Sequence, residues 1–293
     1  KPDELFVIHA ANCTMWSAEA EDYFTCKRCH VFMTNGTHLR NHAEVKAIKR
    51  MANKGWRPWH AQAQQSDLSE KGSFGGSLVA ARHTLQVLPL PGSWIDEKVG
   101  CWRFAIDAHV FTAMSVKFHH GAVVPANGYC KNGLASDEAG QVLQGIREAT
   151  NEGSAPFVCF LDANASPEDM WKSGWPHQLK ATVIRSGEIT CIKNETDMFL
   201  VSNALLGSVV ECTFSRLTPF SPHGCLQLVL SKKAEHLQNW VPVRPRKLLL
   251  VLWNDVDKNP VEEKWNTSFG DGYFDAVLTG GQAHNKLAAN LAQ

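Results

Sequence analysis

The sequence contains no apolar run approaching the roughly 18 residues that cross a bilayer, so it predicts no transmembrane helix. It also has no excess of either charge, because 29 basic residues balance 29 acidic ones. A protein that coats nucleic acid by charge alone needs many Lys and Arg residues to displace counterions. The balance excludes that class, but it leaves room for an enzyme that binds a few phosphates locally.

Two further patterns are missing. No glycine-rich loop followed by Lys and Ser or Thr is present, which disfavours an enzyme acting on nucleoside triphosphates. No charged, apolar and small-residue pattern of a secretory signal follows Lys1. The nine cysteines are odd in number and scattered, and several lie in apolar runs, as Cys159 does. They are typical of small buried side chains in a reducing compartment, so we expect an intracellular protein, nuclear or cytoplasmic.

Hydrophobic residues make up 44% of the chain, enough for a sizeable core. Apolar runs bounded by polar residues predict strands at 5–11, 30–34, 77–81, 122–129, 157–161, 198–202 and 226–230, with two more within 101–116 joined near 107–108. We expect Pro125 to break its strand. Helices are predicted at 40–53, with Val45, Ile48 and Met51 on its apolar side, and at 136–151, capped by Ser136.

Strands dominate, and two substantial helices lie between them. This pattern predicts an α/β (α+β) fold in which sheets pack face to face and helices cover the outer faces. We assign residues 1–235 to this domain. The Pro- and Arg-rich segment 241–246 is typical of a linker, and an apolar strand at 248–253 and a weak helix follow it. Residues 236–293 are therefore predicted to be a linker and a C-terminal extension of unassigned role.

Short polar residues stand where several predicted strands end. They are Asn12, Tyr129, Asp162 with Asn164, Asp197 and His223. Strands fix the direction of such side chains, so their ends are where a β-scaffold builds a site. Each position alone is a weak signal, because an Asp-x-Asn after a strand is more often a turn. The order of the whole set is what indicates a function.

The segments around these residues resemble the motifs of the endonuclease/exonuclease/phosphatase superfamily. Phe160–Pro167 is similar to its Gly-Asp-Phe-Asn motif, and Thr196–Ser202 is similar to its Ile-Asp-Tyr-Phe-Leu-Val-Ser motif. Ser221–His223 stands where the family has Ser-Asp-His. Upstream, Asn12 matches the Asn that ends the family's first strand, Gly75-Gly76 a glycine pair before a strand, and Asn127–Tyr129 a strand that ends in a functional Tyr. The spacing is most like the endonuclease domains of non-LTR retroelements. The resemblance implies a four-layer DNase I-like β-sandwich that hydrolyses phosphodiesters with the help of a divalent metal.

The resemblance also implies roles for these residues. Asp162 would activate or orient the attacking water, and Asn164 would hold the water and the phosphate. Asp197 would orient His223, which with Tyr129 would donate hydrogen bonds to phosphate oxygens. Asn12 and Asp162 would lie next to a Mg²⁺ or Mn²⁺ ion. The His–Asp pairing also makes sense independently, since a carboxylate fixes the imidazole tautomer and stabilises its protonated form.

Two departures from the family pattern affect the metal. Gly36 stands where the family has its metal-binding Glu, with Asn35 at the preceding Gln position, and Pro222 replaces the Asp of Ser-Asp-His. Magnesium usually binds through one or two carboxylates, so we expect weakened metal binding. A neighbouring acid such as Asp67 or Glu70 is a candidate substitute.

Two classes of function therefore stay open. The first is a divalent-metal phosphodiesterase, most simply a DNA endonuclease of retroelement type, which would have DNA as its partner and a reverse transcriptase domain in a longer polypeptide. The second is a catalytically lapsed domain of the same fold that binds nucleic acid or a partner protein. The occupancy of the Glu position distinguishes them, since an acid reaching it from elsewhere favours the first class.

Several other motifs can be interpreted either as functional sites or as ordinary structural residues. Cys26-x-x-Cys29-His30 matches the attachment pattern of c-type haem and could be half of a zinc site with His38 and His42, but we favour two ordinary cysteines at a strand entry. His119-His120 and tryptophans such as Trp56, Trp59, Trp171 and Trp175 fit a surface pair and packing residues better than a chelate or base-stacking platforms. The basic residues at 46–57 and 244–247 are expected to be solvated.

Overall fold

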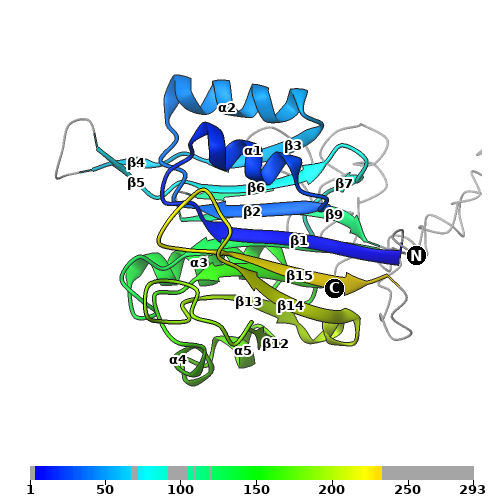
Figure 1. Ribbon diagram of the computed structural model, residues 1–293. Helices are drawn as coiled ribbons and strands as arrows, with labels where there is room; N and C mark the ends of the chain where they lie inside the picture. The colour runs from blue at the N-terminus through cyan, green and yellow to red at the C-terminus, as the bar shows by residue number, and fades with distance from the viewer. Residues whose placement is uncertain (1–3, 67–71, 92–104, 109, 119–120, 233–293) are drawn as a thin grey trace, which may run out of the picture. The chain divides into compact units, whose positions relative to one another are not determined.

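Two β-sheets packed face to face organise the computed structural model, which describes residues 4–66, 72–91, 105–108, 110–118 and 121–232 (Figure 1). Among these residues the first sheet has the strand order β14-β15-β1-β2-β6-β3. Its strands are β1 (Leu5–Asn12), β2 (Val31–Asn35), β3 (Trp56–Ala61), β6 (Ser77–Arg82), β14 (Val209–Ser215) and β15 (Cys225–Ser231).

The second sheet has the order β12-β13-β11-β10-β9-β7, with β8 also pairing with β9. Its strands are β7 (Val87–Leu88), β8 (Ala105–Ala108), β9 (Phe111–Phe118), β10 (Gly121–Tyr129), β11 (Phe157–Asp162), β12 (Ala181–Ile184) and β13 (Asp197–Ser202). A short separate hairpin pairs β4 (Gln64–Gln65) with β5 (Ser73–Phe74).

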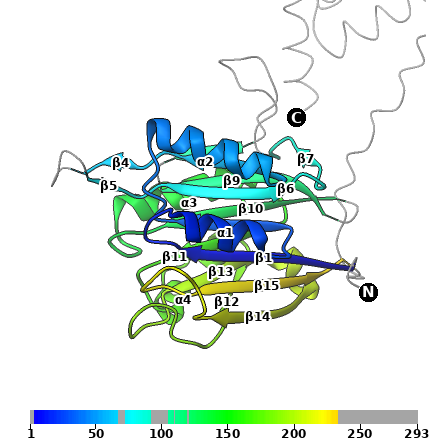
Figure 2. The ribbon, with the colours of Figure 1, turned by 45° about the horizontal axis from the view of Figure 1, so that its top comes forward.

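Helices cover the outer face of each sheet (Figure 2). The first sheet carries α1 (Ala18–Cys26) and α2 (Asn41–Asn53), and the second carries α3 (Asp137–Ala149), α4 (Pro167–Lys172) and α5 (Trp175–Gln178), while a 3₁₀ helix, η2 (Asn203–Ser208), follows β13. The side chains of Ser17 and Ser136 cap α1 and α3 by accepting from Ala20 and Ala139 backbone N–H groups. The predicted sandwich of two sheets with helices on its outer faces is confirmed.

Strand β11 shows why an almost wholly apolar sequence belongs in this sandwich. Val158 and Phe160 point into the core between the sheets, whereas Phe157, Cys159 and Leu161 pack toward the helices. Successive side chains alternate between the faces of a strand, and here both faces are covered. Every residue of β11, including Asp162 at its end, is buried.

Strand register brings the polar strand ends to one edge. Asn12 at the end of β1 lies opposite Asn35 at the end of parallel β2. In the second sheet, Asp162 lies opposite Tyr129 on parallel β10 and opposite Asp197 on antiparallel β13. Strand pairing therefore gathers the polar ends within each sheet, and the packing of the two sheets then brings Asn12 against Asp162.

Two sequence predictions about local structure need correction: the break at Pro125 was wrong, and the apolar side of α2 was right for Ile48 and Met51 but wrong for Val45. Strand β10 runs through Pro125, which stays in register with Val158 of β11. The buried side of α2 consists of Glu44, Ala47 and Met51, whereas Val45 is 61% exposed. Glu44 is buried because it hydrogen-bonds to His60, a contact that hydrophobic periodicity does not encode.

The haem and zinc interpretations of the Cys-x-x-Cys-His segment find no support. Cys29 is buried, and His30 Nδ1 accepts the backbone N–H of Val7 while its ring stacks on Phe6. Within the part of the chain that the structure describes, neither Cys26 nor Cys29 belongs to a group of three or more potential metal ligands. His30 is a packed residue at the entry of the first sheet.

Most of the tryptophans singled out in the sequence are packing residues. Trp56 is fully buried and Trp175 nearly so, whereas Trp171 is half exposed. Among the described residues no helix is both long and apolar enough to span a membrane. The predictions for His119-His120, Asp67, Glu70 and the segment 236–293 with its basic residues lie outside the described residues.

Candidate active site

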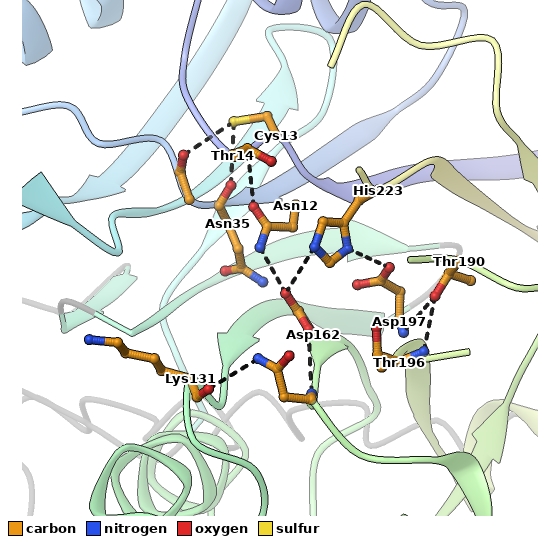
Figure 3. A network of polar contacts seen from close by, with 12 residues as sticks. Asn12, Cys13, Thr14, Asn35, Lys131, Asp162, Thr190, Thr196, Asp197 and His223 are labelled. Atoms are coloured by element: carbon orange, nitrogen blue, oxygen red, sulfur yellow. Dashed lines mark hydrogen bonds and ion pairs between the residues drawn. The ribbon is translucent and has the colours of Figure 1, made fainter. Parts of the chain in front are cut away.

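The site lies where β1, β11 and β13 present polar side chains at one edge of the sandwich (Figure 3). Asn12 ends β1, Asp162 ends β11 and Asp197 begins β13. His223 stands two residues before β15, in a segment that pairs with Cys191. The structure thus brings together four of the residues that the sequence singled out.

Asp162 is at the centre of this group and is 1% exposed. Its Oδ2 accepts a 2.7 Å hydrogen bond from Asn12 Nδ2 and lies 3.8 Å from His223 Nε2, and its Oδ1 accepts a longer bond from the Asn164 backbone. Burial, and then the charge of Asp197, raise the pKa of Asp162 to about 7, against the opposing effects of His223 and Asn12. This carboxyl group therefore binds a proton more readily than an ordinary aspartate does.

His223 and Asp197 form a hydrogen-bonded pair, with His223 Nδ1 2.9 Å from Asp197 Oδ2. Burial alone would lower the pKa of His223, but the hydrogen bond and charge of Asp197, with the charge of Asp162, raise it. Asp197 is fixed in turn by Thr190, whose Oγ1 accepts the backbone N–H groups of Thr196 and Asp197. The imidazole is thus oriented and favoured in its protonated form.

Tyr129 and Asn164 flank Asp162. Burial and the charge of Asp162 raise the pKa of Tyr129 to about 12, so its hydroxyl stays protonated and can donate. Asn164, with a φ of +44°, donates from its side chain to the carbonyls of Cys130 and Lys131. This bond ties the loop after β11 to the loop after β10 and leaves Asn164 exposed at the rim.

Position 36, where the related motif has a metal-binding Glu, supplies only backbone. Gly36 has a φ of +64°, and a Cβ there would overlap Oδ1 of Asn12. That oxygen also accepts the Thr14 backbone N–H at 2.9 Å, so Asn12 turns its nitrogen, not its oxygen, toward Asp162. The preceding Asn35 points between the sheets and donates to the carbonyl of Gly128. Neither residue at the missing motif provides a carboxylate.

The acids that remain could still hold a cation. Asp162, Asp197 and His223 form a group whose potential ligand atoms lie within 4.8 Å of one another. Within the described residues, Oδ1 of Asp197 is buried without a hydrogen-bond partner, and a cation would satisfy such an oxygen. Two carboxylates and an imidazole fit a divalent metal by donor type.

Thr190 was missed by the sequence analysis, although it positions Asp197. It is 1% exposed, and its own backbone carbonyl accepts the N–H of Gly224, next to His223. Nothing in the sequence marks it, because an isolated Thr between strands has no distinguishing pattern.

Comparison with solved structures identifies the fold. The chain is similar to the AP endonuclease LMAP from Leishmania major, with a TM-score of 0.61 and 12% identity over 79% of this chain and 89% of that one. It is similar to the endonuclease domain of TRAS1, a telomere-specific non-LTR retrotransposon, with a TM-score of 0.54 and 12% identity over 78% and 98%. It is also similar to the 3′ phosphatase NExo from Neisseria bound to a product DNA hairpin, with a TM-score of 0.52 and 16% identity over 76% and 98%.

These likenesses confirm the fold that the motifs predicted, the endonuclease/exonuclease/phosphatase sandwich, and they include a retrotransposon endonuclease domain. No protein-family model and no curated protein sequence matches the chain. At 12–16% identity the likeness establishes architecture alone, and the chemistry of this chain is set by its own site residues.

Proposed function

We propose that this protein is a divalent-metal-dependent phosphodiester hydrolase that acts on DNA as an endonuclease of retroelement type. The observation that carries the proposal is the cluster of Asp162, Asp197 and His223 with Asn12, in which both acids and Asn12 are buried although the four come from distant segments. A buried carboxyl group with a strongly raised pKa beside a hydrogen-bonded His–Asp pair is typical of catalytic sites. The likeness to DNA-acting enzymes and to TRAS1 supports the substrate and the type.

The proposed chemistry assigns one task to each side chain. Asp162, with a pKa of about 7, accepts a proton from the attacking water. His223, oriented by Asp197, donates to a phosphoryl oxygen, and Tyr129 and Asn164 provide further hydrogen bonds. A Mg²⁺ or Mn²⁺ ion held by Asp162 and its neighbours would supply positive charge at the phosphate. Asn12 holds the Asp162 carboxylate in place beside it.

A second candidate is a lapsed enzyme that still binds nucleic acid or a protein partner. Gly36 favours it, because this position offers no carboxylate and its side-chain space is taken by Asn12. The retroelement assignment, with a reverse transcriptase domain in a longer polypeptide, is a further part of the proposal, and it depends on the motif spacing and the likeness to TRAS1.

Cleavage of supercoiled plasmid DNA across Mg²⁺ and Mn²⁺ titrations tests the proposal. The natural chain is compared with an Asp162→Ala/His223→Ala double variant and with a matched Asp169→Ala/His177→Ala variant, whose residues are exposed on α4 and α5. We expect metal-dependent nicking that the first variant abolishes and the second retains. Absence of nicking by a folded natural chain, with retained binding of labelled DNA, would support the lapsed domain instead.

A further inference from the structure

A second buried polar cluster lies behind the site and takes no part in the proposed chemistry. His60 on β3 has a fully buried side chain, with Nδ1 2.8 Å from Glu44 Oε1 on α2 and Nε2 2.8 Å from Thr37 Oγ1. Thr37 and Glu44 are themselves 1% and 7% exposed. Such a chain of three polar side chains is costly to bury unless each member is satisfied.

The direction of the Glu44–His60 hydrogen bond follows from donor chemistry. An ionised Glu44 carboxylate only accepts, so Nδ1 of His60 carries the proton of that bond. Nε2 of the same ring is hydrogen-bonded to the Thr37 hydroxyl, whose oxygen also accepts from the Leu39 backbone N–H at 3.4 Å. The chain fixes the Thr37 side chain in one orientation.

Thr37 in turn fixes the loop that follows β2. Its N–H donates to the carbonyl of Gly76 and its carbonyl accepts from Trp16, and a Cβ at Gly76 would overlap its Oγ1. The next residue back, Gly36, lies directly against the Asn12 side-chain oxygen. The Glu44–His60–Thr37 network is therefore connected to the side chain that holds Asp162 through the peptide bond from Gly36 to Thr37 and the close packing of Gly36 against Asn12.

We propose that Glu44 and His60 are positioning residues, which act through Thr37 and Gly36 to hold the Asn12 amide against Asp162. The cation-binding Glu of the related motif is missing at position 36, so the loop contributes to the site by its shape. The effect of these residues on catalysis rests on the proposed function, whereas their effect on the orientation of Asn12 does not. Glu44 and His60 affect only the placement of the Asn12 side chain and do not contact the substrate.

The test uses the whole protein and the ¹H–¹⁵N signals of the Asn12 side-chain amide, assigned by their loss in Asn12→Ala. Thr37→Val removes the hydroxyl at constant shape, Thr37→Ser restores it, and His60→Gln breaks the chain at its centre. The matched control is Thr150→Val, which removes an equally buried hydroxyl on the far side of the fold, where Thr150 bonds Ile146 and Gly153.

We expect Thr37→Val and His60→Gln to shift the Asn12 amide signals and to speed their hydrogen exchange by about tenfold. Thr37→Ser and Thr150→Val should leave the signals in place. On cleavable DNA, kcat should fall on the order of tenfold for the first two variants at unchanged KM, because small misplacements near the chemistry are costly.

Unchanged Asn12 signals in folded Thr37→Val and His60→Gln proteins would overturn this inference, whether or not the protein cleaves DNA. An equal shift in Thr150→Val would also overturn it, because the effect would then be general loosening. A natural chain without nuclease activity would count against the proposed function alone, since the amide signals report the geometry directly.

Discussion

Asn12 and Asp162 stand 150 residues apart on different sheets, yet Asn12 Nδ2 donates a 2.7 Å hydrogen bond to Asp162 Oδ2. The bond joins the two sheets at the edge where the site lies. It also gives a nearly inaccessible carboxylate one strong donor, which a charge in that position requires. The hydrogen bond therefore both stabilises the packing of the two sheets and holds Asp162 in position in the site.

Asn12→Ala should lower the free energy of unfolding by about 1.5–3 kcal/mol, the usual range for a hydrogen bond to a charged group. The loss should be larger at pH 8, where Asp162 is ionised, than at pH 5.5, where it carries a proton. Urea unfolding at both pH values measures the difference. Asn203→Ala, which removes an exposed bond to Thr182, is the control and should have a small, pH-independent effect.

Stability should depend on pH through Asp162. Its folded pKa of about 7 lies above the ordinary value of 3.8, so the folded chain binds this proton more tightly than the unfolded chain. The resulting stabilisation is complete below 3.8 and is lost as pH rises to about 7. His223, with a raised pKa, contributes in the same direction.

Asp162→Asn mimics the protonated carboxyl and removes this dependence. We expect the variant to gain stability relative to the natural chain as pH rises from about 4 to 8, as followed by denaturant midpoints across that interval. Using the difference between the two proteins cancels the titration of all other groups. A difference that stays constant over the interval would show that Asp162 is not perturbed in the folded protein.

The sequence predicted which polar residues would lie close together because the ends of strands are readable. An apolar run that stops at a polar residue locates Asp162 and Asn12, and the packing of the two sheets against each other brings these strand ends together. The fold class followed from the same runs and from the two amphipathic helices. The strand through Pro125 shows the limit, because pairing with β11 at Pro125, and with β9 at the residues on either side of it, overrode a local breaking signal.

What the sequence could not predict are contacts between side chains of unrelated segments. The burial of Glu44 depends on His60, and the orientation of Asn12 depends on the Thr14 backbone. Motif alignment placed Asn12 beside a metal as a possible ligand. Only the folded structure indicates that its nitrogen faces Asp162, since rotamer and hydrogen-bond choices are made by neighbours in space.

The basic residues near the end of α2 should stabilise the fold rather than bind DNA. Arg50 and Lys54 both pair with Glu21, whose side chain is 3% exposed. Arg50→Ala/Lys54→Ala should therefore lower the free energy of unfolding by about 1–3 kcal/mol, since Glu21 loses its partners. DNA affinity and its salt dependence should stay unchanged.

Lys46→Ala/Lys49→Ala is a charge-matched control on the same helix, at two exposed positions. It should leave thermal unfolding unchanged within about 0.5 kcal/mol. Fluorescence anisotropy at several salt concentrations measures binding. A shallower salt slope for the Arg50/Lys54 variant would contradict this assignment, because loss of a phosphate contact reduces the slope by about one.

Gly36→Glu should fail to rebuild a metal site, although it restores the residue found in the related motif. The substitution forces a side chain onto a backbone with a φ of +64°, at a cost of about 1–3 kcal/mol. It also drives Cβ into the Asn12 oxygen, so Asn12 must release either Thr14 or Asp162. The substitution therefore adds a carboxylate to the site but disrupts the hydrogen bonds by which Asn12 holds Asp162 in place.

Isothermal titration with Mn²⁺ and thermal unfolding separate these effects. Gly36→Ala is the matched variant, because it carries the same strain and the same Cβ overlap without a carboxylate. We expect both variants to unfold at lower temperature and neither to bind Mn²⁺ more tightly than the natural chain. If Gly36→Glu alone gained Mn²⁺ affinity, the loop after β2 would have to move as a unit, and the observed packing of Gly36 against Asn12 would be one of two accessible arrangements.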